Sequence, residues 1–414
     1  MFRGRVTGSS ASGVLTPRFW KVIMKRPVIV SAARTPIGSF QGKLSGLSAT
    51  RLGSIVIREV LKRAHLQREQ VEEVIMGNVL AAGLGQAPAR QAALGAGLPH
   101  EVSCMTINKV CGSGLKAVMC AAQAIMSGDA EIVVAGGMES MSNAPYLLMK
   151  ARGGYRLGSG ELVDSMIHDG LWDAYNDFHM GAAGEICARA LKISREEQDE
   201  FAVASYQRAQ KAQAQGAFTR ELIPVHVPQD SAEGVLMSED EEPRRVDFAK
   251  LRQLKPSFEP NGTITAGNAC SISDGAAAVV VMSENKARTL GLKPMAKIIG
   301  YTTYATDPAW FTTAPSKAIT SLFERTDRGA ASVDLFEINE AFAVCSIAVN
   351  RELGLDPAKV NVRGGAVALG HPIGTSGARI LTTLLYALED LHLRCGVASL
   401  CIGGGEAVAM MVER

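Results

Sequence analysis

Two cysteines and one histidine of this 414-residue chain each lie on a glycine-rich turn beside an apolar stretch. Cys111 lies in "NKVCGSGL" at the start of a predicted helix, where free backbone N–H groups and the positive helix end favour a thiolate. His371 lies in "ALGHPIG", a rigid turn that exposes an imidazole. Cys401 is followed by three glycines, 403–405, whose N–H groups can approach a substrate. Together they predict a nucleophile with its catalytic partners, although each alone also fits a buried structural residue.

Strands and helices must hold these turns in place, and the apolar pattern predicts both. Helices are predicted at 46–66 and 115–126, the latter ending at Gly128. Short apolar runs predict strands at 27–35, 71–80, 130–140 and 274–284. Strands that alternate with helices indicate an α/β fold.

A segment in the first part of the chain is similar to a segment in its last part. "EEVIMGN" ends at Asn78 and "VDLFEIN" ends at Asn339, which is 261 positions later by subtraction of the residue numbers. The same offset moves Cys111 to the position beside His371. Two similar α/β halves are therefore predicted, each with a reactive residue at the turn before a helix.

A stretch of different character, about 143–268, interrupts the first half. It combines glycine-rich loops, the aromatic segment "DGLWDAYNDFHMG", a polar helix and an acidic patch that turns basic. Long insertions of this mix usually cover or contact a site. The charge run alone is typical of a solvated surface.

Composition narrows the class of protein. The hydrophobic share is 47%, the charged share 20% and the net charge +2, which favours a soluble globular protein with neither nucleic-acid partner nor membrane span. The eight cysteines include no C-x-x-C pair, so reduced thiols in an intracellular enzyme are expected rather than zinc or a redox dithiol.

The first 26 residues differ from the rest. They are basic, contain Ser and Thr, and lack acidic residues, since the first acid in the chain is Glu59. This pattern predicts a mitochondrial transit peptide over 1–26 and location in the matrix. A disordered basic tail, or a start at Met24 with a cytoplasmic protein, are the alternatives.

Several motifs resemble the thiolase family: "VCGSG", "GGMESMSNAPY", "NEAFA", "GGAVALGHPIGTSGAR" and "CIGGGEA". "SAARTPIGSF", "TINKVCGSG" and "FHMG" are most similar to its acetyl-CoA acetyltransferases, especially the mitochondrial type. The resemblance implies the thiolase fold, two similar βαβαβαββ halves in α-β-α-β-α layers. The halves are expected at 27–284, with a loop domain inserted at about 143–268, and at 292–414. A homo-oligomer, usually a tetramer, is implied too.

The resemblance also implies a reaction, 2 acetyl-CoA = acetoacetyl-CoA + CoA, by ping-pong acyl-cysteine catalysis and Claisen condensation or its thiolytic reverse. Cys111 matches the acyl-accepting nucleophile, and His371 matches its base. Cys401 matches the second acid/base, which removes an α-proton. The N–H groups of Cys111 and Gly403 match one oxyanion hole; His371 and a water fixed by Asn339 match the other.

Substrate contacts are implied in the same way. The positions that match CoA-binding and acyl-pocket residues of the family are Arg245, Val246, Asp247, Lys250, Tyr206, Cys270, His179, Met180 and Phe311. CoA is a substrate, and no cofactor is required. Positions matching a potassium site of the mitochondrial type are Tyr206, Ala266, Gly267, Ala269 and Val367.

Two departures from the family pattern affect the fine shape of this site. Cys270 stands where the family has a serine that touches CoA. Residues 184–186 read Gly-Glu-Ile where Ala-Glu-Asn is usual. The alternatives are a 3-ketoacyl-CoA thiolase of β-oxidation with broader chain length, a β-ketoacyl synthase, and a non-catalytic acyl-CoA or lipid carrier. A synthase relies on His where this chain has Cys401.

Overall fold

The computed structural model describes residues 24–228 and 234–414, so most of the predicted transit peptide lies outside the described residues. The first half follows the predicted alternation of strands and helices. Its strands are β1 (Pro27–Arg34), β3 (Glu73–Gly77), β4 (Ser103–Ile107), β5 (Ile132–Ser140) and β12 (Ser273–Ser283), with the two-residue β2 (Gly38–Ser39) beside β12. Its helices are α1 (Ala49–Arg63), α2 (Pro88–Gly95) and α3 (Ser113–Ser127).

The second half repeats this order of strands and helices, except that the strand equivalent to β4 is reduced to a single bridge. Its strands are β13 (Ala296–Ala305), β14 (Leu335–Ile338), β15 (Cys395–Ile402) and β16 (Glu406–Glu413). Its helices are α8 (Ala314–Thr326), α9 (Ala343–Leu353), the short α10 (Ala366–Leu369) and α11 (Ser376–Asp390), and α7 (Glu284–Thr289) connects the halves. The counterpart of β4 is only an isolated bridge between Phe336 and Val360.

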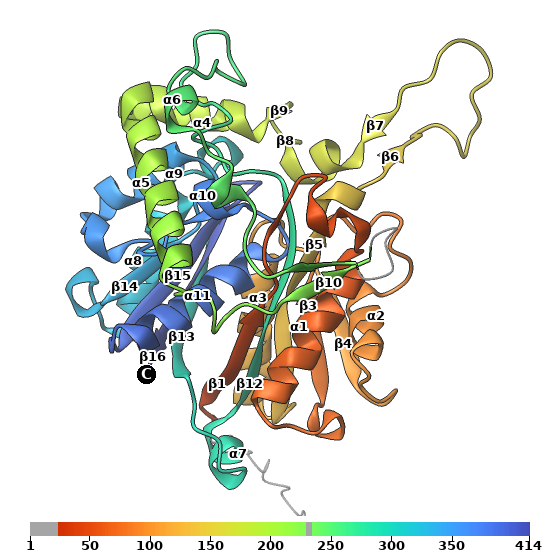
Figure 1. The fold of residues 1–414 in the computed structure, drawn as a ribbon, viewed down its shortest axis with the longest axis vertical. Helices are drawn as coiled ribbons and strands as arrows, with labels where there is room; N and C mark the ends of the chain where they lie inside the picture. Colours follow the sequence, from red (N-terminus) through yellow and green to blue (C-terminus); the bar gives the residue numbers. More distant parts are fainter. Residues whose placement is uncertain (1–23, 229–233) are drawn as a thin grey trace, which may run out of the picture.

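The strands form a continuous sheet in the order β14-β15-β16-β13-β1-β12-β5-β3-β4 (Figure 1). The two halves join where Val28 pairs with Lys297 and Ile29 with Ala296. Strand β3 is parallel to β4 and β5, and β14 is parallel to β15. Parallel strands end at the same edge, so within the first half the turn after β4 lies beside the ends of β3 and β5, and within the second half the turn after β15 lies beside the end of β14.

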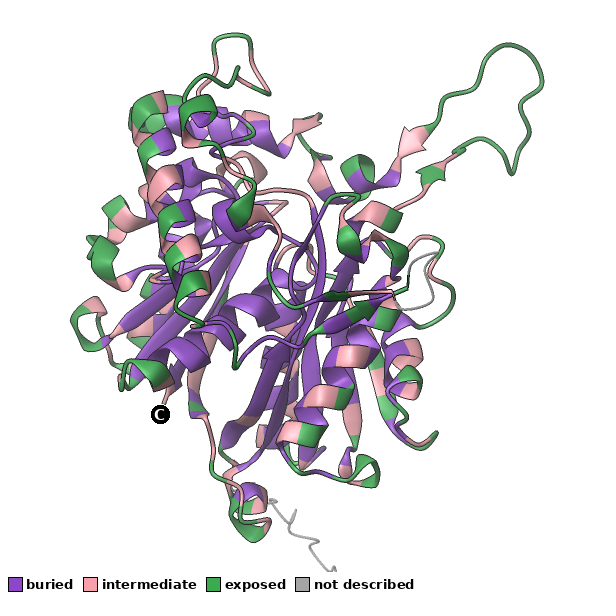
Figure 2. Ribbon diagram, viewed as in Figure 1, coloured by how far each residue is buried: buried purple, intermediate pink, exposed green. Residues whose placement is uncertain are grey.

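Apolar clusters define five layers. Helices α1 and α2 pack on the outer face of the first half, and α8 with α9 covers the second. Helices α3 and α11 pack against each other between the two arms of the sheet (Figure 2). Residues 376–388 of α11 are buried throughout, including the charged Arg379, so α11 lies inside the core and not on its surface.

Helix α3 ends as its sequence predicts, with Gly128 in the left-handed conformation at φ 87°. The window Val110–Ser127 has the length and apolar composition of a membrane span, contrary to the expectation from sequence. Its apolar residues instead pack against α11, β5 and β12. The core of a protein accounts for this composition.

The insert of the first half covers the second half. Its helices are α4 (Met180–Leu191), α5 (Arg195–Ala214) and α6 (Phe248–Leu251), and α4 and α5 both contact α9. Its short strands are β6 (Tyr146–Leu147), β7 (Val163–Asp164), β8 (Trp172–Asp173), β9 (Phe178–His179), β10 (Val225–Val227) and β11 (Val235–Met237). The chain between β6 and β7 projects from the body as a long arm (Figure 1).

Candidate active site

Cys111 lies in a tight turn between β4 and α3. The preceding residue, Val110, has φ 43°, a conformation that a β-branched residue rarely adopts. The Ser113 hydroxyl holds this turn, because it donates to the carbonyl of Val110 at 2.7 Å and accepts from the N–H of Lys109 at 2.8 Å. Strain at a single residue is typical of functional sites. Here it fixes the residue before the thiol.

His371 lies in the turn between α10 and α11 and is buried. Its Nδ1 lies 2.5 Å from the Oγ of Ser376, which donates its own proton to the carbonyl of Pro372 at 3.0 Å. Ser376 must therefore accept from Nδ1–H, which leaves the lone pair on Nε2. Gly370, at φ 103°, permits this turn. The arrangement makes Nε2 a proton acceptor.

Asn339 directly follows β14 and faces that acceptor. Its Nδ2 lies 3.5 Å from the Nε2 of His371, at the long end of hydrogen-bond distance. Its Oδ1 is buried without a partner among the described residues. A buried amide oxygen without a partner is costly, so this side of Asn339 is suited to an ordered water or a substrate group.

Gly403 and Cys401 complete the group at the end of β15. A Cβ on Gly112, the residue after Cys111, would clash with Ile402, and one on Gly403 would lie 3.6 Å from Val110. The backbone N–H groups of Gly403 and Cys111 lower the pKa of the Cys111 thiol, whereas Cys401 raises it. A Cβ on Gly403 would lie 3.7 Å from the sulfur of Met180. The two halves therefore bring the nucleophile, the second cysteine and the predicted oxyanion donors together.

Burial decides the charge state of this group. It raises the pKa of Cys111 to about 12, assisted by Cys401 and opposed by the two backbone N–H groups. Burial, followed by Arg379, lowers the pKa of His371 to about 3. The resting pair is thus a thiol and a neutral imidazole, which corrects the expectation of a thiolate favoured by the helix end. Cys111 precedes the first residue of α3 by two positions, and desolvation outweighs the helix dipole.

The predicted acyl-pocket residues reach the same place. Met180 and Phe311 are buried in one apolar cluster with Cys401, and Phe311 meets Phe342 edge to face at 6.5 Å. His179 accepts the N–H of Gly181 at 3.1 Å, and its ring stacks on Phe258 at 4.7 Å. These contacts give a tight, apolar wall beside Cys401.

The predicted nucleotide contacts lie on another part of the insert. Arg245 is exposed and pairs with Glu242 at 3.5 Å. Asp247 caps α6 by accepting the N–H groups of Ala249 and Lys250, and its carboxylate also pairs with the Lys250 ammonium at 3.4 Å. Val246 is partly buried against the apolar cluster that contains Ala202, Tyr206 and Ala209 of α5. These side chains lie at the surface, where they can meet phosphates.

Tyr206 and Cys270 lie between these two groups. Tyr206 meets Phe248 of α6 edge to face at 6.5 Å. Burial, followed by the nearby charges of Glu242, Glu340 and Cys270, raises the pKa of its hydroxyl. Burial raises the pKa of Cys270, and the sulfurs of Cys111 and Cys401 contribute. Cys270 therefore lies near enough to Cys111 and Cys401 for their charges to affect its pKa.

Family comparison agrees with this geometry. The model described as "Thiolase, N-terminal domain" matches residues 27–285, and the one described as "Thiolase, C-terminal domain" matches residues 292–414. The chain belongs to the thiolase family. The fold expected from the sequence is confirmed.

Relatives of this thiolase carry consistent names. An acetyl-CoA acetyltransferase of Schizosaccharomyces pombe is 52% identical over 387 residues, covering 93% of this chain and 98% of the relative. Acetyl-CoA acetyltransferase 1 of Arabidopsis thaliana is 55% identical over 387 residues, covering 93% of each chain. The crystal structure of the Bacillus anthracis acetyl-CoA acetyltransferase superposes with a TM-score of 0.92 at 42% identity, covering 94% of this chain and 99% of that one.

The structure of this thiolase adds a residue that sequence reasoning missed. Glu139 is fully buried and accepts hydrogen bonds from Asn78 Nδ2 at 2.8 Å and from the N–H groups of Val79, Leu80 and Gly374. Burial raises its pKa to about 7. Gly374 belongs to the turn of His371, so Glu139 ties the two halves together. An acid inside the apolar run "IVVAGGMES" was the available signal.

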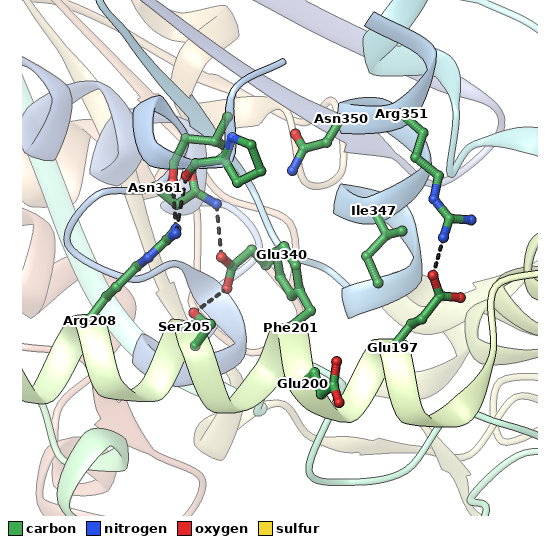
Figure 3. Close-up of a pocket in the computed structure, with 13 residues that line it drawn as sticks. Glu197, Glu200, Phe201, Ser205, Arg208, Glu340, Ile347, Asn350, Arg351 and Asn361 are labelled. Carbon is green, nitrogen blue, oxygen red and sulfur yellow. Dashed lines mark hydrogen bonds and ion pairs between the residues drawn. The ribbon is translucent and has the colours of Figure 1, made fainter. Parts of the chain in front are cut away.

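A pocket of about 410 Å³ opens between α5 and α9, away from the residues described above (Figure 3). It reaches Glu340, whose carboxylate accepts from Ser205 Oγ at 2.7 Å and from Asn361 Nδ2 at 2.9 Å. Cys111, His371 and Cys401 are not among its lining residues. Glu340 links α5 to the segment of Asn339 through its bond with Ser205.

Proposed function

We propose that this thiolase catalyses 2 acetyl-CoA = acetoacetyl-CoA + CoA, in either direction. The single observation that carries the proposal is that the turn of Cys111 meets the turn that follows Cys401, because Gly112 packs against Ile402 and Gly403 lies beside Val110. An acyl-transfer enzyme that also forms a carbon–carbon bond needs a nucleophile, a second base and an oxyanion hole. The names of the relatives supply the acetyl specificity.

In the first half-reaction the Cys111 sulfur attacks the thioester carbonyl of acetyl-CoA. Its proton passes to Nε2 of His371, the acceptor left free by Ser376. The N–H groups of Cys111 and Gly403 stabilise the oxyanion. The C–S bond to CoA then breaks, and the proton on Nε2 passes to the CoA sulfur. A resting thiol suits this sequence, since the proton moves only when the carbonyl is in place.

In the second half-reaction the Cys401 thiolate takes an α-proton from another acetyl-CoA. Asn339 Nδ2 is the donor available to the enolate oxygen beside His371. The enolate carbon bonds to the acetyl carbon on Cys111, whose C–S bond breaks. The Cys111 thiolate then recovers a proton from the Cys401 thiol, and acetoacetyl-CoA leaves.

Chain-length preference tests the proposal against a broader 3-ketoacyl-CoA thiolase. Because Met180 and Phe311 wall the space beside Cys401, thiolysis of acetoacetyl-CoA should far exceed that of 3-ketoacyl-CoAs with long chains. The measurement is kcat/KM for a series of rising chain length. Equal values out to long chains would favour the broader enzyme.

Potassium is part of the proposal, at Tyr206 and the carbonyls of Ala266, Gly267, Ala269 and Val367. The residues fit a hard cation, because the first three carbonyls accept no hydrogen bond from another described residue. Tyr206 and Val367 lie in one buried cluster. Replacing KCl with NaCl should raise the KM for CoA esters, and Tyr206→Phe should reduce that difference. Identical kinetics in both salts would exclude the site.

CoA is proposed to bind along Arg245, Val246, Asp247, Lys250 and Cys270. The exposed basic groups suit phosphates, whereas a thiol at 270 is a weaker hydrogen-bond partner than a hydroxyl. Cys270→Ser should lower the KM for acetyl-CoA by about fivefold, the value of one hydrogen bond. An unchanged KM would remove residue 270 from the CoA contacts.

A homotetramer is proposed from two exposed features. Strand β4 is the edge of the sheet and is only partly buried, so it can pair with a second copy. The projecting arm exposes Leu148, Met149, Leu157 and Leu162. Light scattering should give the mass of a tetramer, and Leu157→Ser with Leu162→Ser should reduce it. A monomer would contradict this assembly.

Import into mitochondria is proposed for the basic segment 1–26. The relatives include bacterial enzymes, so a cytoplasmic enzyme is the competing assignment. A reporter fused to residues 1–30 should enter mitochondria, and Arg3, Arg5 and Arg18 replaced by Glu should prevent import. A cytosolic reporter would favour the alternative.

A further inference from the structure

An ion pair joins the two turns that carry the predicted oxyanion donors. The Nζ of Lys109, two residues before Cys111, pairs with the carboxylate of Glu406, three residues after Gly403. Lys109 and Glu406 are 297 positions apart and belong to different halves of the chain. In the part of the chain that the structure describes, no other pair of side chains between residues 108–113 and 402–406 forms a hydrogen bond or an ion pair. The reaction proposed above gives neither residue a role.

The same two turns also touch through apolar groups. Gly112 packs so closely on Ile402 that a Cβ there would clash, and a Cβ on Gly403 would lie 3.6 Å from Val110. Apolar contact is non-directional, so it holds the turns together without fixing the direction of their N–H groups. A hydrogen bond between charged groups has a preferred geometry and can fix one turn relative to the other.

Both partners of the ion pair are anchored to rigid backbone. The N–H of Lys109 donates to the Oγ of Ser113 at 2.8 Å, inside the turn of the nucleophile. Glu406 is the first residue of β16, where it lies opposite Ile402 of β15 and Ala305 of β13. A constraint between the two side chains is therefore passed to the backbone of both turns.

The exposure of this pair indicates what it contributes. The side chains of Lys109 and Glu406 are 22% and 35% exposed, respectively. Ion pairs that reach solvent add little to the stability of a fold. An oxyanion hole, in contrast, depends on the placement of its donors, and a displacement of about 1 Å can cost roughly a hundredfold in rate. Loss of this pair should therefore affect the rate more than the stability.

We propose that Lys109 and Glu406 are positioning residues, whose ion pair clamps the Cys111 turn to the Gly403 turn and sets the separation of the two N–H donors of the oxyanion hole. The inference rests on the proposed function, in which those N–H groups stabilise the oxyanion. Neither side chain exchanges a proton with the substrate. Both act only through the backbone that they hold.

The experiment uses the full chain and measures single-turnover acetylation of Cys111 by labelled acetyl-CoA, the KM for acetyl-CoA, and Tm. Lys109→Met and Glu406→Gln each remove one charge with little change in side-chain length. The double variant Lys109→Glu with Glu406→Lys restores the pair in reverse. Arg328→Met is the matched control, because it removes a partly buried ion pair with Glu413, 3.2 Å long, at the other end of β16.

Lys109→Met and Glu406→Gln should each slow acetylation by about tenfold, with the KM for acetyl-CoA within about twofold of native. Their Tm should match that of Arg328→Met, which should acetylate at the native rate. The double variant should regain most of the native rate. Native rates in both single variants would overturn the proposal, as would a double variant as slow as the single ones. If one single variant does not fold, the other decides together with the double variant. A native enzyme that does not acetylate Cys111 would instead overturn the proposed function.

Discussion

The two halves of the molecule place different residues at equivalent positions of the same strand pair. In the first half Gly77 of β3 lies opposite Gly137 of β5, and in the second half Ile338 of β14 lies opposite Ser399 of β15. One residue after the first strand comes Asn78 in one half and Asn339 in the other. Two residues along the second strand come Glu139 and Cys401, respectively.

The contacts of these residues separate support from chemistry. Asn78 donates to Glu139 at 2.8 Å, and Glu139 also accepts from Gly374 in the turn of His371. The Nδ2 of Asn339 instead lies 3.5 Å from the Nε2 of His371, and among the described residues it bonds no carboxylate. Both asparagines leave a buried Oδ1 without a partner among the described residues, so the difference lies in Nδ2: that of Asn78 bonds the Met138 carbonyl and Glu139, whereas that of Asn339 faces the imidazole of His371. The first half thus holds the turn of His371, and under the proposed mechanism the second half supplies the reacting groups on it.

Removing Cys401 tests this assignment with the largest expected effect. Cys401→Ala should still form acetyl-Cys111, while condensation falls about a thousandfold because the base for the α-proton is lost. Labelled acetyl-CoA measures the first step and acetoacetyl-CoA formation the second. Cys111→Ala should lose both. Near-normal condensation by Cys401→Ala would refute the division of roles.

Replacing the two asparagines in parallel sharpens the comparison. Asn339→Ala should reduce the condensation kcat by about a hundredfold, the value of one oxyanion donor, with little change in Tm. Asn78→Ala should instead cost about 1 to 3 kcal/mol of stability, because a buried carboxylate loses a donor. Kinetics and thermal unfolding of both variants provide the test, and a reversed pattern would show that the halves do not divide in this way.

Ser376 tests how the second half prepares its base. Ser376→Ala should slow acetylation of Cys111 about tenfold, because Nδ1 loses the acceptor that keeps Nε2 unprotonated. Thr382→Val is a suitable control, since it removes another buried hydroxyl from α11. A similar loss in both variants would indicate general disruption of the helix.

The pH dependence has the smallest expected effect. Because the pKa of His371 is lowered to about 3, its imidazole stays neutral far below pH 6. The acetylation rate should therefore change by less than about threefold between pH 5.5 and 7.5, where an ordinary histidine with a pKa of about 6.5 would lose most of its neutral form at the acid end. Rapid-quench measurement of acetyl-Cys111 tests this, and a steep fall below pH 6.5 would contradict it.

Local sequence was informative about the turns and the elements around them. The apolar periodicity of 115–126 and the stop at Gly128 gave α3 to within two residues, since both signals are local. The offset between Asn78 and Asn339 located equivalent strand ends, because a repeated unit keeps its strand and turn chemistry. The family motifs then attached roles to Cys111, His371 and Cys401.

Tertiary structure decided what no single segment contains. The charge states of Cys111 and His371 depend on burial by both halves, which outweighs the helix end that the sequence suggested. The hydrogen bond from the Gly374 N–H to Glu139 joins residues that are far apart in the chain. Sequence therefore determined which residues could react, and packing decided their protonation and partners, because desolvation and hydrogen bonding depend on everything that surrounds a group in space.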